Sequence, residues 1–251
     1  MIWCRSLLFQ AYFYGLTAVL ALTATPAILF GRGAVERVTR LWARGVLLGL
    51  KIICRLDFEF RGLDRLPPRP YLVAAKHQSA WDTVVFALAI PGSVYVLKAE
   101  LLHIPFYGWA CRRLGHIPVD RRAGAGAMRG LLRRAARTVE RGDPIVIFPE
   151  GTRVAPGETR RYQPGVSALY AHLDIPVVPV GLNSGLFWPR RSFLRHPGKI
   201  VLEIGQPIEA GLARKTFSAR LEAEIEAITR RLEAEAGFPV PPAKENRESR
   251  G

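Results

Sequence analysis

The sequence predicts an α/β protein in which a mixed β-sheet is covered by helices, preceded by a membrane-anchoring helical segment. From residue 57 onward, short β-rich runs alternate with helical patterns, which is typical of a sheet packed between helices. Before that point, no charged residue stands between Arg5 and Arg32, and about 20 apolar residues suffice to cross a bilayer. We therefore expect anchoring helices over residues 1–56, one domain over 57–236 and a disordered tail over 237–251.

The uncharged N-terminal stretch also predicts the orientation of the chain. Small residues at 23–27 imitate a signal-peptidase site, but the apolar run is long and only Arg5 precedes it, which favours a retained anchor. Four arginines follow the run closely, namely Arg32, Arg37, Arg40 and Arg44. By the positive-inside rule, the body of the protein is expected on the cytosolic side of the inner membrane.

The segment from residue 37 to 55 repeats basic residues at helical spacing. Arg37, Arg40, Arg44, Lys51 and Arg55 share one helical face, and mostly apolar residues occupy the rest. This pattern predicts a helix in the membrane interface with its cations toward lipid phosphates. Two alternatives stay open: a surface helix packed on a soluble core, and a hairpin with the first segment that dips into one leaflet.

The remaining elements follow from hydrophobic periodicity. Candidate strands cover residues 58–61, 71–75, 94–98, 117–120, 145–148, 177–181 and 200–204. Candidate helices cover residues 81–89, 106–114, 125–141, 165–173 and 217–235. In the last helix, Leu221, Ile225, Ile228 and Leu232 fall on one side, and the charged residues are expected elsewhere.

Composition restricts the class of partner. With 251 residues, 49% of them hydrophobic, the chain is large enough for a sizeable core. The formal net charge of +15 points to a polyanionic partner, which is a nucleic acid, an anionic bilayer or a phosphorylated substrate. The three cysteines are widely spaced, so neither a disulfide scaffold nor a thiolate metal site is expected, and a reducing compartment is the simplest setting.

A histidine and an aspartate stand close together directly after a predicted buried strand. His77 precedes Asp82 by five positions, and strand ends in α/β folds open into ligand crevices. A histidine there can take a proton from an attacking hydroxyl when a carboxylate holds its other ring nitrogen. The pair suits a general base with its orienting group, although a single pair at this spacing also arises by chance.

A second polar run, Phe148-Pro149-Glu150-Gly151-Thr152-Arg153, follows another predicted buried strand. Gly151 lets the backbone approach a ligand, and Thr152 adds a hydroxyl that can cap a helix. Arg153 can grip a phosphate through two charge-assisted hydrogen bonds. The alternative is a turn at a strand end, shaped by a buried pair between Glu150 and Arg153.

These runs resemble the motifs of the glycerolipid acyltransferases, typified by 1-acyl-glycerol-3-phosphate acyltransferase. The first family motif, H-x4-D, is matched by His77 and Asp82. The second, G-x-I-x-[IV]-D-R, is matched by Gly115, Ile117, Val119, Asp120 and Arg121. The third, F-P-E-G-T-R, is matched without a change by residues 148–153, and the fourth by Val178, Pro179 and Val180. The motifs occur in family order, and the resemblance covers roughly residues 57–210.

The resemblance implies an acyltransferase domain with the family's fold and chemistry. The implied reaction moves a fatty acyl group from an acyl carrier protein or coenzyme A thioester to the sn-2 hydroxyl of lysophosphatidic acid. His77 is then the base and Asp82 orients its ring. Arg153, with Arg121 and Glu150 in support and beside Gly151 and Thr152, is expected to hold the acceptor's phosphate. No metal or other cofactor is expected, and anionic membrane lipids are expected partners.

Two lysines bear on this interpretation of the site. Lys76 stands immediately before the histidine, where many family members carry Asn, and a cation so close disfavours the protonated imidazole ring. Lys98 is expected to face the substrate phosphate, with a solvated lysine as the alternative. The run from Gly165 to Leu169 lacks the second glycine of G-x-S-x-G, so no acyl-serine intermediate is expected.

Two other functions remain open from the sequence. The motifs specify the reaction better than the acceptor, so the acceptor is alternatively another lyso-lipid, such as a lyso-ornithine lipid or a lysophospholipid with a larger headgroup. A non-catalytic membrane-binding or nucleic-acid-binding protein would also use the positive charge. The intact His77 and Asp82 pair counts against that class, and no zinc-finger spacing or aromatic RNA-binding motif supports nucleic acid.

Overall fold

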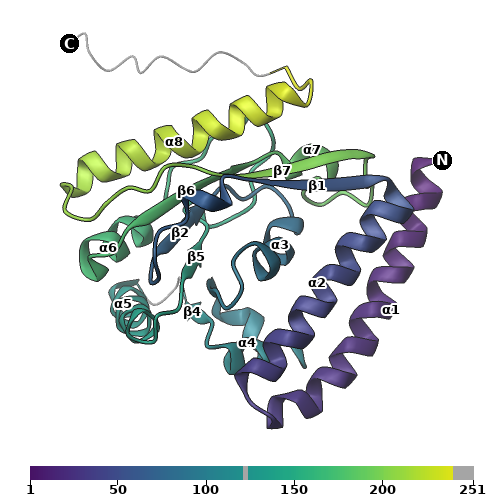
Figure 1. The fold of residues 1–251 in the computed structure, drawn as a ribbon, viewed down its shortest axis with the longest axis horizontal. Coiled ribbons are helices and arrows are strands. Elements are labelled where there is room, and N and C mark those ends of the chain that lie inside the picture. The colour runs from purple at the N-terminus through teal and green to yellow at the C-terminus, as the bar shows by residue number, and fades with distance from the viewer. Residues whose placement is uncertain (121–123, 240–251) are drawn as a thin grey trace.

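The computed structural model describes residues 1–120 and 124–239, with the backbone alone described at residues 23 and 24. Two N-terminal helices lie side by side along one flank of an α/β body (Figure 1). The predicted tail lies outside the described residues from residue 240 onward, and so does Arg121.

The described strands form one seven-stranded sheet in the order β1-β7-β6-β2-β5-β3-β4. The strands are β1 (Leu56–Arg61), β2 (Leu72–Ala75), β3 (Val94–Lys98), β4 (Ile117–Val119), β5 (Ile145–Ile147), β6 (Val177–Leu182) and β7 (Gly198–Ile204). Neighbouring strands are parallel except β6 and β7, which are antiparallel. The predicted mixed sheet is confirmed, and each predicted strand is present.

The centre of the sheet brings two separate parts of the sequence to one edge. Every residue of β2, β5 and β6 is buried, because parallel strands covered on both faces are apolar throughout. In register, Leu72 of β2 faces Ile145 of β5 on one side and Val177 of β6 on the other. Since these strands run in the same direction, the segments that leave them after Ala75 and Ile147 emerge next to each other.

Helices cover both faces of the sheet. They are α1 (Ile2–Leu29), α2 (Arg32–Cys54), α3 (Trp81–Ala89), α4 (Tyr107–Leu114), α5 (Gly124–Glu140), α6 (Pro164–Leu173), α7 (Ser184–Phe187) and α8 (Arg214–Glu235). On one face, a core cluster joins α1, α2 and α3 to the sheet through residues such as Leu50, Trp81 and Phe86. On the other face, α5, α6 and α8 contribute Leu131, Leu169 and Phe217.

The first two helices form a closely packed hairpin. A Cβ at Gly49 would lie 2.3 Å from a ring carbon of Tyr12, and one at Gly45 would lie 2.8 Å from a methyl group of Leu16. Both distances are shorter than real contacts, so a side chain at either position would displace Tyr12 or Leu16. The Tyr12 hydroxyl also donates a hydrogen bond of 2.9 Å to the carbonyl oxygen of Gly45. The two helices therefore pair as a hairpin, and α2 also packs on the body of the protein through Val46 and Leu50. Insertion of the hairpin into one leaflet stays a prediction.

The hairpin presents a surface suited to lipid. Residues 2–22 of α1 are long and apolar enough to cross a membrane by length and composition, and most of this stretch is not buried inside the protein. On α2, Arg37, Arg44 and Lys51 are exposed, as predicted. The apolar side chains of Leu41, Leu48 and Ile52 are exposed beside them. This mixture of cations and apolar groups is typical of a helix in a membrane interface.

We expect the substitution Gly49→Leu to lower the melting temperature of the protein in detergent, because a side chain at this position displaces Tyr12 and separates α1 from α2. Overpacking of this kind costs about 1–3 kcal/mol. Gly15→Leu is the matched control, since a Cβ at Gly15 on α1 meets no atom within 4 Å. Equal melting temperatures for the two variants would show that the hairpin is not packed as described.

Candidate active site

The predicted His–Asp pair is formed. His77 lies just beyond the end of β2, and Asp82 lies in the first turn of α3. The Nδ1 atom of His77 is 2.9 Å from Oδ2 of Asp82, and the side chain of Asp82 is fully buried whereas that of His77 is 12% exposed. A carboxylate at this distance holds Nδ1 as the protonated nitrogen. The Nε2 atom is then left as a proton acceptor.

The carboxylate of Asp82 is held by further hydrogen bonds. Its Oδ2 atom accepts hydrogen bonds from the backbone nitrogens of Gln78, at 2.7 Å, and Ser79, at 2.8 Å. Its Oδ1 atom accepts one of 2.6 Å from the hydroxyl of Ser184. All of these contacts use the oxygens as acceptors, so they suit the ionised carboxylate that stabilises a protonated imidazole.

Ser184 is a residue of the site that the motifs did not reveal. It is fully buried at the start of α7, directly after β6, which contains the fourth motif and pairs with β2. The only signal for it in the sequence is its position behind a strand that the sheet order places next to β2. The strand that contains the fourth motif therefore places Ser184 beside Asp82.

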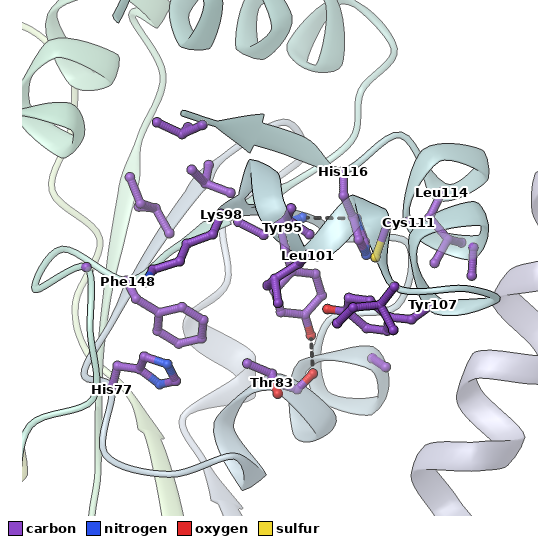
Figure 2. A pocket seen from close by; sticks show the side chains of 18 of the residues that line it. His77, Thr83, Tyr95, Lys98, Leu101, Tyr107, Cys111, Leu114, His116 and Phe148 are labelled. Atoms are coloured by element: carbon purple, nitrogen blue, oxygen red, sulfur yellow. Dashed lines mark hydrogen bonds between the residues drawn. The ribbon is translucent and has the colours of Figure 1, made fainter. Parts of the chain in front are cut away.

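The ring of His77 is held in plane by an aromatic neighbour. Phe148, the first residue of the third motif, stacks on it with the ring centroids 4.1 Å apart and the planes inclined by 19° (Figure 2). The backbone of His77 is also fixed, because its carbonyl oxygen accepts a hydrogen bond of 2.8 Å from the nitrogen of Val154. The third motif thus supports the first.

Glu150 lies behind the pocket and not in it. Its carboxylate is buried, and Oε2 accepts a hydrogen bond of 3.0 Å from the backbone nitrogen of His77. Its Oε1 atom lies 2.7 Å from Nζ of Lys76. We had expected Glu150 to support Arg153 at a substrate phosphate. Buried against Lys76 and His77, Glu150 instead holds the backbone of the histidine. Its ion-pair partner is Lys76 and not Arg153, which was the alternative.

The side chain of Lys76 is buried on the far side of the segment from the pocket. The side chain is 1% exposed, and its ammonium contacts Glu150 and Glu226, each at 2.7 Å. Successive side chains of an extended segment point to opposite sides, so Lys76 enters the core under α8 while His77 faces the pocket. Two acidic side chains contact its ammonium there.

Burial raises the pKa of the Glu150 carboxyl from 4.5 to about 7, against the opposing effect of the Lys76 ammonium. The folded protein then retains a proton on Glu150 that the unfolded chain releases above pH 4.5. The stabilisation from this proton is complete below pH 4.5 and is lost as the pH rises through about 7.

We expect Glu150→Gln to flatten the fall in melting temperature over this range, since Gln does not titrate. Thermal melts of both proteins in detergent, with Glu224→Gln as a control on α8, measure the difference. Parallel curves for wild type and Glu150→Gln would contradict the raised pKa.

A large pocket lies in front of His77, with a volume of about 1170 Å³. Its lining includes His77 and the polar side chains of Lys98, Thr152, Arg153, Arg190 and Arg191. Gly151 also lines the pocket, in the left-handed conformation with φ of 68° that favours glycine. The structure thus brings the predicted residues Lys98, Gly151, Thr152 and Arg153 to one site.

Arg190 and Arg191 were not predicted as site residues. They follow α7, and a guanidinium nitrogen of Arg190 donates a hydrogen bond of 2.8 Å to the carbonyl oxygen of Arg153. Both line the same pocket as His77. An adjacent pair of arginines after a short helix carries no motif, so the pair is recognised only once the fold places it beside Arg153.

Away from His77, the pocket is lined mostly by apolar side chains. Figure 2 shows His77, Phe148 and Lys98 toward one end, and Tyr107, Cys111 and Leu114 toward the other. Polar groups in this part of the lining form hydrogen bonds with each other. The backbone nitrogen of Tyr95 donates to Nδ1 of His116, and the Tyr95 hydroxyl donates to the carbonyl oxygen of Thr83. Burial lowers the pKa of His116 to about 4, so its ring is neutral and the wall is uncharged.

The pocket extends to the N-terminal hairpin. Tyr14 and Leu20 of α1 and Val38 and Trp42 of α2 are among the residues that line it. An apolar chain within the pocket therefore contacts the same helices that present a lipid-seeking surface. In the part of the chain that the structure describes, no group of three or more His, Cys, Asp or Glu side chains is placed to bind a metal ion.

A His–Asp pair facing a large, mostly apolar pocket is an arrangement with which an enzyme activates a hydroxyl group. The chain belongs to the acyltransferase family, because a sequence model of that family, described as Acyltransferase, matches residues 57–183. The predicted family is thereby confirmed, and the chain is an enzyme.

Two relatives and one solved structure show how far the similarity extends. The 1-acyl-sn-glycerol-3-phosphate acyltransferase of Pseudomonas aeruginosa is 33% identical over 183 residues, which are 73% of this chain and 71% of that protein. The alpha enzyme of the same name from Homo sapiens is 32% identical over 178 residues, 70% of this chain and 62% of that protein. The crystal structure of the 1-acyl-sn-glycerophosphate acyltransferase from Thermotoga maritima is similar with a TM-score of 0.77, at 24% identity, over 94% of this chain and 98% of that one. This last likeness confirms the fold.

Proposed function

We propose that this enzyme transfers a fatty acyl group from a thioester to the sn-2 hydroxyl of lysophosphatidic acid, giving phosphatidic acid for phospholipid synthesis. One observation carries the proposal: His77 lines a pocket whose other lining residues include several cations and many apolar side chains. Lysophosphatidic acid has a phosphate close to its free hydroxyl and a single acyl chain, which matches this polarity. The names of the two relatives support the same substrate.

In the proposed reaction, Nε2 of His77 takes the proton of the acceptor hydroxyl. The oxygen attacks the thioester carbonyl, a carbon–oxygen bond forms, and the carbon–sulfur bond breaks. The protonated ring of His77, stabilised by Asp82, then gives its proton to the leaving thiolate. The hydrogen bonds of Ser167 are consistent with direct transfer, without an acyl-serine. Its hydroxyl donates to the carbonyl oxygen of Pro164 and accepts from Arg214.

Cations around His77 position the acceptor in this proposal. Arg153 and Lys98 bind the phosphate, and Arg190 holds the backbone of Arg153 in place. A doubly charged phosphate needs more than one cation, and Arg191 adds a further one to the same lining. Holding the acceptor in this way aligns hydroxyl, base and carbonyl, and such alignment lowers a barrier by several kcal/mol.

The donor is the thioester of an acyl carrier protein or of coenzyme A, since both present the same reacting carbonyl. The enzyme works at the inner membrane with its catalytic domain in the cytosol. The exposed cations and apolar side chains of α2 support this placement, because together they bind anionic lipid at an interface.

An acceptor panel tests the proposal. The full-length enzyme in detergent, supplied in turn with acyl carrier protein and coenzyme A thioesters, is offered lysophosphatidic acid, lyso-ornithine lipid and lysophosphatidylethanolamine. We expect kcat/KM to be largest for lysophosphatidic acid with at least one donor. A larger value for either other acceptor would move the assignment to that lipid, and no transfer with any pair would contradict the proposed reaction.

A further inference from the structure

Helix α8 carries charged residues that face inward. Glu226 and Glu233 are 5% and 1% exposed, although the apolar pattern of the helix predicts its charges away from the apolar side. The prediction of Leu221 and Leu232 on the buried side is right, but the two glutamates share that side. They lie beyond residues 57–183, which match the family model, so no motif accounts for them.

The helix approaches the sheet closely enough for short side chains to bridge the gap. A Cβ at Gly181 of β6 would lie 2.4 Å from Ile228 and 2.9 Å from the backbone nitrogen of Thr229. Only glycine fits there. Strand β2 lies next to β6 in the sheet. The carboxylates of Glu226 and Glu233, on either side of this contact, therefore reach the segment that follows β2.

Glu226 contacts the residue that precedes the catalytic histidine. Its Oε1 atom is 2.7 Å from Nζ of Lys76 and accepts a hydrogen bond of 3.2 Å from the Tyr162 hydroxyl. Lys76 also donates to the carbonyl oxygen of Glu158 at 3.2 Å and contacts Glu150. The lysine thus joins α8 to the carboxylate that holds the backbone nitrogen of His77.

Glu233 contacts the residue that follows the histidine. Its Oε1 atom accepts a hydrogen bond of 2.6 Å from the side-chain amide of Gln78, and its Oε2 atom accepts one of 3.1 Å from the nitrogen of Gly157. Gln78 in turn accepts a hydrogen bond of 3.1 Å from the nitrogen of Gly185, next to Ser184. The second contact therefore leads to the serine that holds Asp82.

We propose that α8 is a positioning element of the active site, in which Glu226 and Glu233 hold the two neighbours of His77 and so fix the imidazole relative to Asp82. The two glutamates are seven positions apart, about two helical turns, and lie on one face. Lys76 and Gln78 are two positions apart and point the same way from an extended segment. The spacing on the helix therefore matches the spacing around the histidine.

Lys76 and Glu226 form a matched pair in this arrangement. A buried ammonium requires compensating carboxylates, and removing one partner leaves an uncompensated buried charge that distorts its surroundings. Removing both partners leaves the second acidic neighbour, Glu150, without its ammonium. Burial raises the pKa of that carboxyl, so it takes up a proton and no unpaired charge remains. The lysine in place of the Asn expected from the family resemblance is tolerated because α8 supplies Glu226.

The test uses full-length Glu226→Gln, Lys76→Asn and the double variant, with Glu224→Gln on the same helix as the control. We expect each single variant to lower kcat by about 10- to 100-fold, as small displacements of a catalytic group do, with KM for both substrates changed by less than about threefold. The double variant is expected to recover at least tenfold of the combined loss, because the two changes share one interaction. Glu224→Gln should retain the wild-type rate.

A merely structural α8 would give different results. Single variants with lowered melting temperatures but wild-type kcat per folded molecule would overturn the proposal, and so would losses that simply multiply in the double variant. The inference rests on the proposed function, so a second readout is independent of turnover. In protein labelled with [15N]histidine, the ring nitrogens of His77 should report protonated Nδ1 in wild type and a mixture of tautomers in Glu226→Gln. Unchanged shifts would overturn the proposal even if the acceptor is another lipid.

Discussion

The substitution His77→Ala is expected to lower kcat by about 10² to 10⁴-fold, because the group that takes the hydroxyl proton is lost. Folding and membrane association should be unaffected, since the side chain faces the pocket and the hairpin is not touched. Asp82→Asn should lose somewhat less, because the ring remains but its orientation and charge stabilisation are weakened. Initial rates on folded, lipid-bound protein measure both effects.

Two measurements show that His77→Ala still folds and binds membranes. Its melting temperature and its flotation with anionic vesicles should match those of wild type. A folded variant that transfers acyl groups at near the wild-type rate would exclude His77 as the base. The base would then have to come from another group of the pocket.

The substitution Arg153→Ala is expected to raise KM for lysophosphatidic acid by about 10- to 150-fold. This corresponds to the loss of one charge-assisted contact, worth about 1.5–3 kcal/mol. KM for the acyl donor should change far less. Lys at this position should recover only part of the loss, because a point charge does not reproduce the two-pronged contact of a guanidinium. Kinetics with each substrate varied in turn separate the two effects.

Arg160→Ala is the matched control, since Arg160 lies exposed in the same connection between β5 and α6. If Arg153 only shaped the turn, its removal would impair both substrates equally and lower the melting temperature. The phosphate site would then be assigned to Lys98 and Arg190, which line the same pocket.

The sequence predicted most of the fold because its elements are strongly periodic. The buried strands β2, β5 and β6 are short and apolar, and helices α3 and α5 begin and end within one residue of their expected bounds. The packing of α1 against α2 was left open, because it depends on the absence of a Cβ at Gly45 and Gly49. Hydrophobic periodicity does not register such a contact.

The candidate site was predictable where its residues are close together in the chain. His77 and Asp82 pair across one turn, so their spacing already contains the geometry. Ser184 and Glu226 reach the same site from 102 and 150 positions away. Their roles depend on which strands are neighbours and on which face α8 lies. The inward charges of α8 were missed because a buried carboxylate is indistinguishable from a solvated one until its partner is located.

The transfer reaction itself is the most direct test. Full-length enzyme in detergent is given an isotopically labelled acyl thioester and lysophosphatidic acid, and the lipid product and the released thiol are both counted. A reaction without enzyme gives the background, and His77→Ala is assayed in the same way. The account predicts one labelled phosphatidic acid for each thiol released, and neither above background in His77→Ala. Thiol release without labelled lipid, or equal product from His77→Ala, would contradict direct acyl transfer at this site.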